Sequence, residues 1–286
     1  MQHQEGRFQG SGNVEIYYQS WHPLGEAKAA LLIVHGLGEH SGRYRHVVEH
    51  LVPRGYGVYT FDLRGFGRSG GQRGHVNSMA EYHQDIKAMR AIIQEAEAGK
   101  KVFMMGHSMG ALIMLAYLLR YPDDLCGFIA SGTALEQSGI SPLLVLAVKV
   151  LSRLAPRFNL KSGLEVAAIS RNPAVVEAYR SDPLVHDVVT PRLGMELLRT
   201  KEWVNAHLTE ITLPFLVLHG GADRIIPSLA GRRLYEKATS TDKEYIEYEG
   251  GYHEPHNDLC YAQAVADLEG WLDRQVCAGA SLTAAD

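Results

Sequence analysis

Residues 102–110 read VFMMGHSMG, a short apolar run that leads into a serine flanked by two glycines. The Gly106-x-Ser108-x-Gly110 pattern is typical of a sharp turn between a strand and a helix that exposes a nucleophilic serine. Glycine suits both flanking positions because it has no Cβ, so that strand and helix can approach each other closely. The apolar segment that follows, residues 111–120, favours a buried helix. This stretch therefore predicts a strand, a turn and a helix, with the Ser108 hydroxyl at the turn.

Similar apolar runs before and after this stretch predict the remaining strands. Residues 29–34 (AALLIV) are apolar without alternation, as expected for a strand buried on both faces of a parallel sheet. Further strands are expected near Phe8 and over residues 14–20, 55–61, 125–130, 213–219 and 244–248, and helices over residues 44–53, 79–98 and 261–276. Strands that alternate with helices indicate an α/β fold, in which helices cover both faces of a mostly parallel sheet.

Residues 133–206 depart from this alternation. The segment has no strand-like run, and short helices broken by prolines replace the strands. We expect a helical cap at 133–206, inserted between a first core part at 1–132 and a second at 207–277, with a flexible tail at 278–286.

Within the expected cap, residues 141–151 (SPLLVLAVKVL) are almost wholly apolar. They predict either a buried packing helix or a helix that faces lipid or lines a substrate tunnel. The second alternative would let the protein draw acyl substrate from a membrane surface through a transient contact of the cap.

The amino-acid composition limits which classes of protein this chain can belong to. Among the 286 residues, 46% are hydrophobic and 21% are charged, which is ordinary for a globular chain. A formal net charge of −4 without any Lys/Arg run argues against a nucleic-acid partner. The three widely spaced cysteines, Cys126, Cys260 and Cys277, indicate neither a disulfide framework nor a metal motif. We expect them in the core of a protein from the reducing cytoplasm.

The N-terminus is polar, and no run approaches the roughly 18 apolar residues of a transmembrane helix. The sequence therefore predicts a soluble protein that is at most peripheral to a membrane. It leaves the oligomeric state open.

The residues with candidate chemistry all follow strand ends, where ligands bind in parallel α/β sheets. A serine hydroxyl needs a base to take its proton, and the base needs an orienting partner. The chain order Ser…Asp…His that accompanies this serine motif selects Asp223 and His253. Asp223 would accept from the His253 Nδ1–H, which leaves Nε2 to take the Ser108 proton. His256 and His219 are the rival bases.

A developing oxyanion needs two backbone donors, and the expected ones are the N–H groups of Met109 and Leu37. Asp62 opens a D-x-R-G-x-G-x-S loop, and we expect its carboxylate to hold that loop through backbone N–H groups. His107 is expected to be packed rather than catalytic. This chemistry requires no metal and no organic cofactor.

Several stretches together resemble the monoacylglycerol lipases. They are residues 35–44 (HGLGEHSGRY), 106–110 (GHSMG), 170–173 (SRNP) with 179–184, and 251–253 (GYH), within a similarity that spans about residues 12–271. The resemblance implies an α/β-hydrolase fold with a helical lid that cleaves monoacylglycerols to fatty acid and glycerol.

By position, Ser108, Asp223 and His253 match the triad of this family, and Leu37 and Met109 match its oxyanion hole. The residues that match its glycerol-binding groups are Glu39, Arg43, Tyr179 and His256. One departure is Ala111, where the family pattern has a further glycine; alanine is small enough for the turn to keep its geometry.

The sequence therefore predicts a serine hydrolase that cleaves carboxylic esters of single-chain lipids through an acyl-enzyme. Lysophospholipase and broad carboxylesterase activities are alternatives. Three less favoured functions are a cofactor-free haloperoxidase, a peptidase and a non-enzymatic carrier of acyl ligands. They remain alternatives because a fold alone does not decide between functions. Acyl length, positional preference on glycerol and opening of the cap at membranes stay open.

Overall fold

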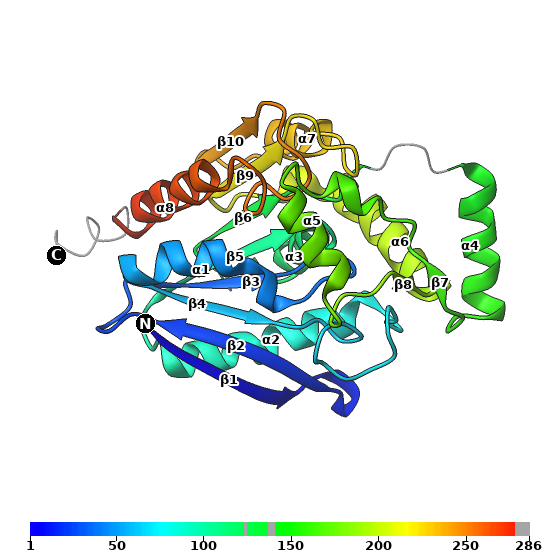
Figure 1. Ribbon diagram of the computed structural model, residues 1–286, viewed down its shortest axis with the longest axis horizontal. Helices are drawn as coiled ribbons and strands as arrows, with labels where there is room; N and C mark the ends of the chain where they lie inside the picture. The colour runs from blue at the N-terminus through cyan, green and yellow to red at the C-terminus, as the bar shows by residue number, and fades with distance from the viewer. Residues whose placement is uncertain (123–124, 137–140, 278–286) are drawn as a thin grey trace.

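An eight-stranded sheet lies at the centre of the protein, with helices on both faces (Figure 1). The computed structural model describes residues 1–122, 125–136 and 141–277. The strand order is β1-β2-β4-β3-β5-β6-β9-β10, and β2 runs antiparallel to both β1 and β4, whereas all other neighbours pair in parallel. The sheet strands are β1 (Gln2–Gln9), β2 (Glu15–His22), β3 (Ala29–Val34), β4 (Tyr56–Phe61), β5 (Lys101–His107), β6 (Gly127–Ser131), β9 (Phe215–Gly220) and β10 (Lys243–Tyr248).

The helices alternate with these strands, as the sequence predicts. They are α1 (Arg45–Leu51), α2 (Met79–Ala96), α3 (Met109–Leu118), α4 (Pro142–Leu154), α5 (Pro173–Ser181), α6 (Pro191–His207), α7 (Leu229–Lys237) and α8 (Tyr261–Cys277). Short 3₁₀ turns lie at Ser11–Asn13, Ser41–Tyr44, Val52–Arg54, Val166–Ala168 and Leu208–Glu210. The predicted α/β architecture is confirmed; α7, whose sequence is mostly polar, is an addition to it.

The side chains of β3 show how the sheet divides the core. Successive side chains of a strand point to opposite faces, so Leu31 and Ile33 pack towards α1 and α8, whereas Leu32 and Val34 pack towards α2 and α3. All six residues of β3 are buried. The unbroken apolar run is therefore explained by a strand that is covered on both sides.

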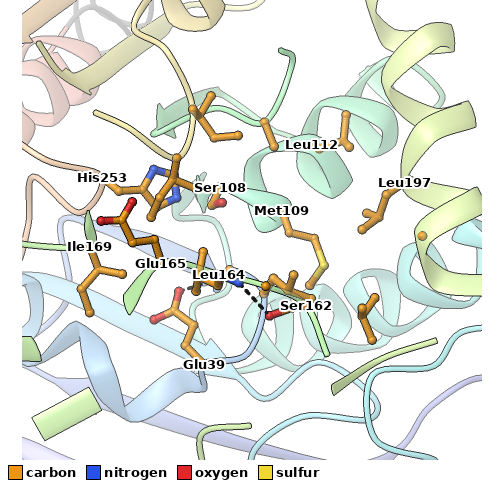
Figure 2. Close-up of a pocket in the computed structure, with 18 of the residues that line it drawn as sticks. Glu39, Ser108, Met109, Leu112, Ser162, Leu164, Glu165, Ile169, Leu197 and His253 are labelled. Atoms are coloured by element: carbon orange, nitrogen blue, oxygen red, sulfur yellow. Dashed lines mark hydrogen bonds between the residues drawn. The ribbon is translucent and has the colours of Figure 1, made fainter. Parts of the chain in front are cut away.

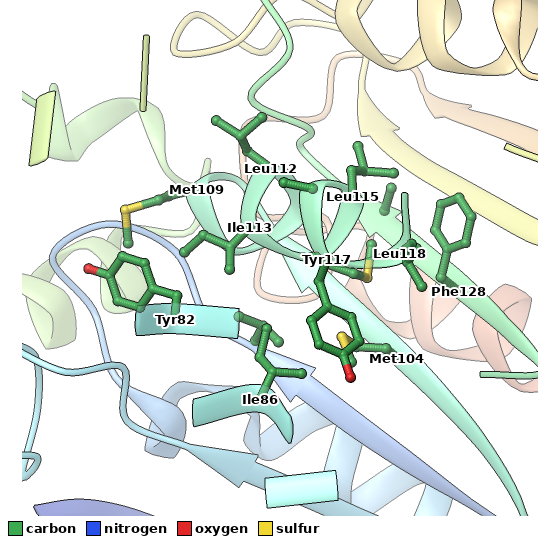
Figure 3. Packing of buried hydrophobic residues seen from close by; sticks show 14 of the residues in the cluster. Tyr82, Ile86, Met104, Met109, Leu112, Ile113, Leu115, Tyr117, Leu118 and Phe128 are labelled. Carbon is green, nitrogen blue, oxygen red and sulfur yellow. The ribbon is translucent and has the colours of Figure 1, made fainter. Parts of the chain in front are cut away.

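Helix α3 is the most deeply enclosed helix next to the sheet. All ten of its residues are buried, and Figure 3 shows side chains around its circumference, with Tyr82 and Ile86 of α2 on one side and Phe128 of β6 on another. An all-apolar helix has no solvent face to turn outward. This packing fixes the first turn of α3, and with it the position of Ser108.

Between β6 and β9 the chain leaves the sheet, and we call residues 132–214 the inserted segment. It carries α4, α5, α6 and a two-residue antiparallel ladder of β7 (Leu160–Lys161) and β8 (Val188–Val189). The expectation that this region holds no strand is therefore wrong, because a ladder this short leaves no periodicity in the sequence. Helix α6 ends at His207, one residue beyond the expected boundary, and the expected tail at 278–286 lies outside the described residues.

Helix α4 stands apart from the sheet at one side of the molecule (Figure 1). The expectation that residues 141–151 form a buried packing helix is wrong. The exposed fractions of Leu143, Leu146, Val150 and Leu154 are 78%, 57%, 45% and 78%. Ser141 caps the start of the helix, and its hydroxyl accepts from Leu144 N–H at 3.2 Å. An apolar stripe on this helix therefore faces solvent.

The cysteines are a second correction. Cys126 and Cys277 are exposed and Cys260 is partly buried, so that none belongs to the core. Cys126 lies in the turn before β6 and Cys277 ends α8. Position at an element boundary, rather than the apolar character of the thiol, decides their exposure.

Candidate active site

Ser108 lies in a strained turn between β5 and α3. Its φ of 51° and ψ of −117° fall in a region that non-glycine residues rarely adopt. A Cβ on Gly106 would lie 2.6 Å from Ala111 Cα, and a Cβ on Gly110 would overlap the carbonyl oxygens of Val34 and His35. Both glycines of the motif are therefore required by close backbone contacts, and Ala111 fits beside Gly106.

Asp223 and His253 come together from the loops after β9 and β10. His253 Nδ1–H donates to Asp223 Oδ2 at 2.7 Å, and Asp223 Oδ1 also accepts from the N–H groups of Ile225 and Ile226 at 2.8 and 2.9 Å. Burial raises the pKa of Asp223, but the neighbouring His253 charge and these hydrogen bonds outweigh it and hold that pKa well below its usual range. The carboxylate is thus ionised and faces Nδ1, which leaves the other ring nitrogen of His253 available.

Ser108 and His253 line the same cavity, of about 420 Å³. Figure 2 shows the two residues next to each other, with Glu39 on one side of the cavity and Leu197 on the other. The larger part of the wall is apolar and comes from α3, α4, α6 and the loop after β9, through Leu112, Leu144, Val148, Leu197, Leu198 and Ile225. The cavity therefore has room and surface for an aliphatic chain beside the serine.

Leu37 and Met109 also line this cavity beside Ser108. Met109 is the first residue of α3, so its N–H is among the first four of the helix, which have no acceptor within the helix. Leu37 lies in the loop after β3. Their location suits the two backbone donors expected from the sequence.

The polar end of the cavity is formed by Glu39, Glu254 and Tyr179. Arg43 lies behind them: it donates to Glu39 at 2.8 Å and to both oxygens of Glu254 at 2.7 and 2.8 Å. Its guanidinium also lies 4.6 Å from the centre of the Tyr179 ring. Arg43 thus holds the polar groups of the cavity without lining it.

Both carboxylates accept several hydrogen bonds. Glu39 accepts from Gly36 N–H at 2.6 Å and from the Tyr44 hydroxyl at 2.9 Å, in addition to Arg43. Burial raises the pKa of Glu254, but the charge and hydrogen bonds of Arg43 have the larger effect and lower this pKa to about 2. Counted formally, these two carboxylates and one guanidinium carry one net negative charge; Lys201, Arg224 and Glu165 also line the cavity.

His256 is buried behind the cavity rather than in its wall. Its ring stacks on Tyr44 at 4.9 Å and meets His107 edge-on at 5.0 Å, and neither ring nitrogen has a hydrogen-bond partner among the described residues. Burial and the nearby His107 lower the pKa of His256 to about 3. His107 packs against His253 at 4.8 Å, and its Nδ1 lies 3.3 Å from Ser131 Oγ. His107 is packed, as expected.

Asp62 has the structural role that its loop predicts. It accepts from the N–H groups of Ser41 and Arg68 at 2.8 and 2.6 Å. The described residues contain no cluster of three or more His, Cys, Asp or Glu side chains that could hold a metal ion. None of the helices in that part of the chain is both long and apolar enough to cross a membrane.

The sequence motifs did not single out Glu254, and they treated His219 only as a rival base. Glu254 directly follows His253, so its position in the chain was the available signal. His219 lies at the end of β9, with Nε2 3.3 Å from Asp223 Oδ2. It is therefore a neighbour of the carboxylate rather than of Ser108.

Known proteins are similar to this chain over most of its length. The family described as "Serine aminopeptidase, S33" matches residues 25–259. A monoacylglycerol lipase of Mycolicibacterium smegmatis is 36% identical over 94% of this chain and 96% of its own. Phospholipase YtpA of Bacillus subtilis is 33% identical over 80% and 89%.

Among solved structures, a monoacylglycerol lipase of Paleococcus ferrophilus superposes with a TM-score of 0.83 and 37% identity, over 91% of this chain and 99% of that one. The fold, the serine turn and these similarities agree. The chain belongs to the serine aminopeptidase S33 family of α/β-hydrolases and, within it, to the monoacylglycerol lipases.

Proposed function

We propose that this protein hydrolyses monoacylglycerols, or closely similar single-chain acyl esters, to fatty acid and alcohol. The observation that carries the proposal is a single cavity that joins Ser108 and His253 to an apolar wall on one side and to hydroxyl-accepting carboxylates on the other. The monoacylglycerol lipases among the relatives support the same substrate class.

In the proposed reaction, Ser108 Oγ attacks the ester carbonyl while His253 Nε2 takes its proton. Asp223 accepts from Nδ1–H, so it holds the ring in that tautomer and stabilises the imidazolium. The N–H groups of Leu37 and Met109 stabilise the oxyanion, and loss of one such donor typically costs about 10²–10³ in rate. His253 then protonates the leaving alcohol, and water activated by the same ring releases the acyl group from Ser108.

The polar end favours an uncharged alcohol over a phosphate. A Cβ on Gly36 would lie 3.0 Å from Glu39 Oε1 and 3.3 Å from Ser108 Cβ, so the carboxylate is close to the reacting serine. Carboxylates accept from glycerol hydroxyls but repel a phosphate, most strongly where water is excluded. The net negative charge therefore disfavours the lysophospholipase alternative, although one relative is named a phospholipase.

A second candidate is an aminopeptidase, because the same net negative charge could bind the ammonium group of a peptide N-terminus. The family description supports this alternative. Against it, a peptide would leave the apolar wall without a matching chain. We therefore rank ester hydrolysis first and include an aminoacyl arylamide in the test.

We further propose that the inserted segment acts as a cap, and that α4 contacts a lipid surface transiently. Its exposed stripe of Leu143, Leu146, Val150 and Leu154 supports this, since large exposed apolar patches mark interaction sites. Leu144 and Val148 of the same helix line the cavity. A substrate chain could thus pass from the lipid surface to Ser108 along one helix.

The deciding experiment compares kcat/KM for a monoacylglycerol, the matching lysophosphatidic acid, a short soluble ester and an aminoacyl arylamide. The proposal expects the monoacylglycerol to be the best substrate, with the anionic lipid at least tenfold poorer at low salt. Ser108→Ala should abolish hydrolysis and labelling by a fluorophosphonate. Labelling without turnover of any substrate would instead indicate a different reaction, and a protein that is neither labelled nor active would be an acyl-ligand carrier.

A further inference from the structure

His219 and Asp223 form a buried contact that the proposed reaction does not use directly. His219 ends the apolar part of β9, and its side chain and that of Asp223 are fully buried. Its Nε2 lies 3.3 Å from Asp223 Oδ2 and 3.0 Å from the Ile226 carbonyl oxygen. His219 does not line the cavity that contains Ser108.

The surroundings of His219 fix its tautomer. Both atoms near Nε2 are acceptors, so Nε2 carries the proton and shares it between them. Nδ1 faces α7, where a Cβ on Gly231 would lie 2.7 Å from it, and it has no hydrogen-bond partner among the described residues. A second ring proton would be buried there without an acceptor. His219 is therefore a donor through Nε2 that points at the turn after β9.

This donor completes the coordination of Asp223. The N–H groups of Ile225 and Ile226 hold Oδ1, His253 Nδ1–H donates to Oδ2, and His219 Nε2 approaches the same Oδ2 at 3.3 Å. The second contact of His219, to the Ile226 carbonyl, braces the same turn. The carboxylate thus cannot rotate about its Cβ–Cγ bond without breaking hydrogen bonds at both oxygens.

We propose that His219 is a positioning residue for the reaction: its Nε2–H fixes the Asp223 carboxylate and shares the oxygen that faces His253. The inference rests on the proposed function, because it assigns His219 a role in orienting the base. An oxygen with two donors interacts less strongly with each. Removal of the His219 donor should therefore strengthen the hydrogen bond between Asp223 and His253.

Other titratable groups around this cluster stay unchanged in the test. They are His107, whose ring lies 4.8 Å from that of His253, Glu254, which follows His253 in the chain, and Tyr245 of β10, whose ring packs beside Gly231. A change in pH dependence between variants at position 219 therefore reports the loss of its donor.

The experiment compares His219→Leu with His219→Gln, whose amide N–H can occupy the place of Nε2–H. We expect His219→Leu to lower kcat/KM for a short soluble ester about tenfold, well short of the ~10⁴-fold cost typical of disabling the triad carboxylate. The acidic limb of the pH profile of kcat/KM should move up by about half a pH unit, because Asp223 Oδ2 then accepts a hydrogen bond from His253 alone. His219→Gln should return both kcat/KM and the pH of the acidic limb to the values of the unsubstituted protein.

A measurement on the unsubstituted protein keeps the inference testable if His219→Leu does not fold. Nitrogen NMR of histidine-labelled protein should show the ring proton of His219 on Nε2 and not on Nδ1. An Nδ1–H tautomer would overturn the proposal, as would a folded His219→Leu with an unchanged profile or a His219→Gln no better than His219→Leu. Failure of the proposed function is distinguishable, because the protein would then hydrolyse no ester while the tautomer remained measurable.

Discussion

Arg43 and Glu254 form a two-point ion pair, at 2.7 and 2.8 Å, that joins the loop after β3 to the loop carrying His253. The residues are 211 positions apart in the chain, and both side chains are almost fully buried. Because Glu254 is bonded to His253 through the backbone, the pair fixes the distance between the expected base and the loop of Leu37. The same guanidinium holds Glu39 at the polar end of the cavity.

Arg43→Gln should therefore lower both stability and activity. It leaves two buried carboxylates without their cation, and breaking a buried ion pair costs about 3–5 kcal/mol. We expect the free energy of urea unfolding to fall by about that amount and kcat/KM to fall with it. The control is Arg45→Gln, which removes an exposed pair with Glu49 and should stay within about 1 kcal/mol of the unsubstituted protein. Equal stability of the two variants would contradict this assignment.

His256 predicts how stability depends on pH. Its pKa is lowered by burial and by His107 to about 3, against an ordinary value of 6.5. Between these two values the unfolded chain binds a proton that the folded protein does not, so stability is lost as pH falls below 6.5. One such histidine contributes at most about 1.4 kcal/mol per pH unit.

His256→Phe keeps the stacking on Tyr44 and removes the proton-binding group. We expect its free energy of unfolding to fall less steeply between pH 6.5 and pH 5 than that of the unsubstituted protein. Val265→Ala, in the core of α8, serves as a control that lowers stability without removing a titratable group. If the free energy of unfolding fell equally steeply with pH in His256→Phe and Val265→Ala, His256 would not be the source of the acid sensitivity.

Gly110→Ala should prevent a stable serine turn. The added Cβ would overlap the carbonyl oxygens of Val34, the last residue of β3, and of His35 directly after it, which cannot move without distorting the sheet. Overpacking in a core typically costs about 1–3 kcal/mol or more. Thermal unfolding measures the effect, and Gly25→Ala, where no atom lies within 4 Å of the added Cβ, should be near neutral.

Serine at Leu143, Leu146 and Val150 tests the lipid-facing surface of α4. We expect the triple variant to bind phospholipid vesicles more weakly and to lose activity on dispersed monoacylglycerol, since apolar burial drives interfacial binding. Its kcat/KM for a short soluble ester should not change. The matched control replaces Leu24, Leu229 and Leu259, which are also exposed but lie outside α4. Equal vesicle binding by both triple variants would show that exposed leucines in general, and not α4, mediate the contact.

The sequence predicted the parts of the protein that depend on local pattern. Continuous apolar runs mark strands covered on both faces, and the Gly106-x-Ser108-x-Gly110 motif with its Ser…Asp…His order identified residues that the fold brings together. Apolar composition alone could not tell which way α4 faces, because the same stripe suits a core or a lipid surface.

Long-range side-chain geometry was beyond the sequence. The partner of Arg43 lies in a distant loop, and only the fold shows that Glu254 faces the same cavity as Glu39. His219 similarly had the sequence context of a rival base, at a strand end directly after Leu218. Its role depends on which ring nitrogen points at Asp223, which is a property of the packing against α7.

The two carboxylates at the polar end also affect how a catalytic cycle would finish. Deacylation of Ser108 would release a fatty-acid anion whose new charge lies close to Glu39 and Glu254. Like charges repel strongly where water is scarce, so the same groups that accept a neutral alcohol would push the acid product away from the serine. The product would then leave along the apolar wall beneath α4, and the enzyme would resist inhibition by the fatty acid it makes.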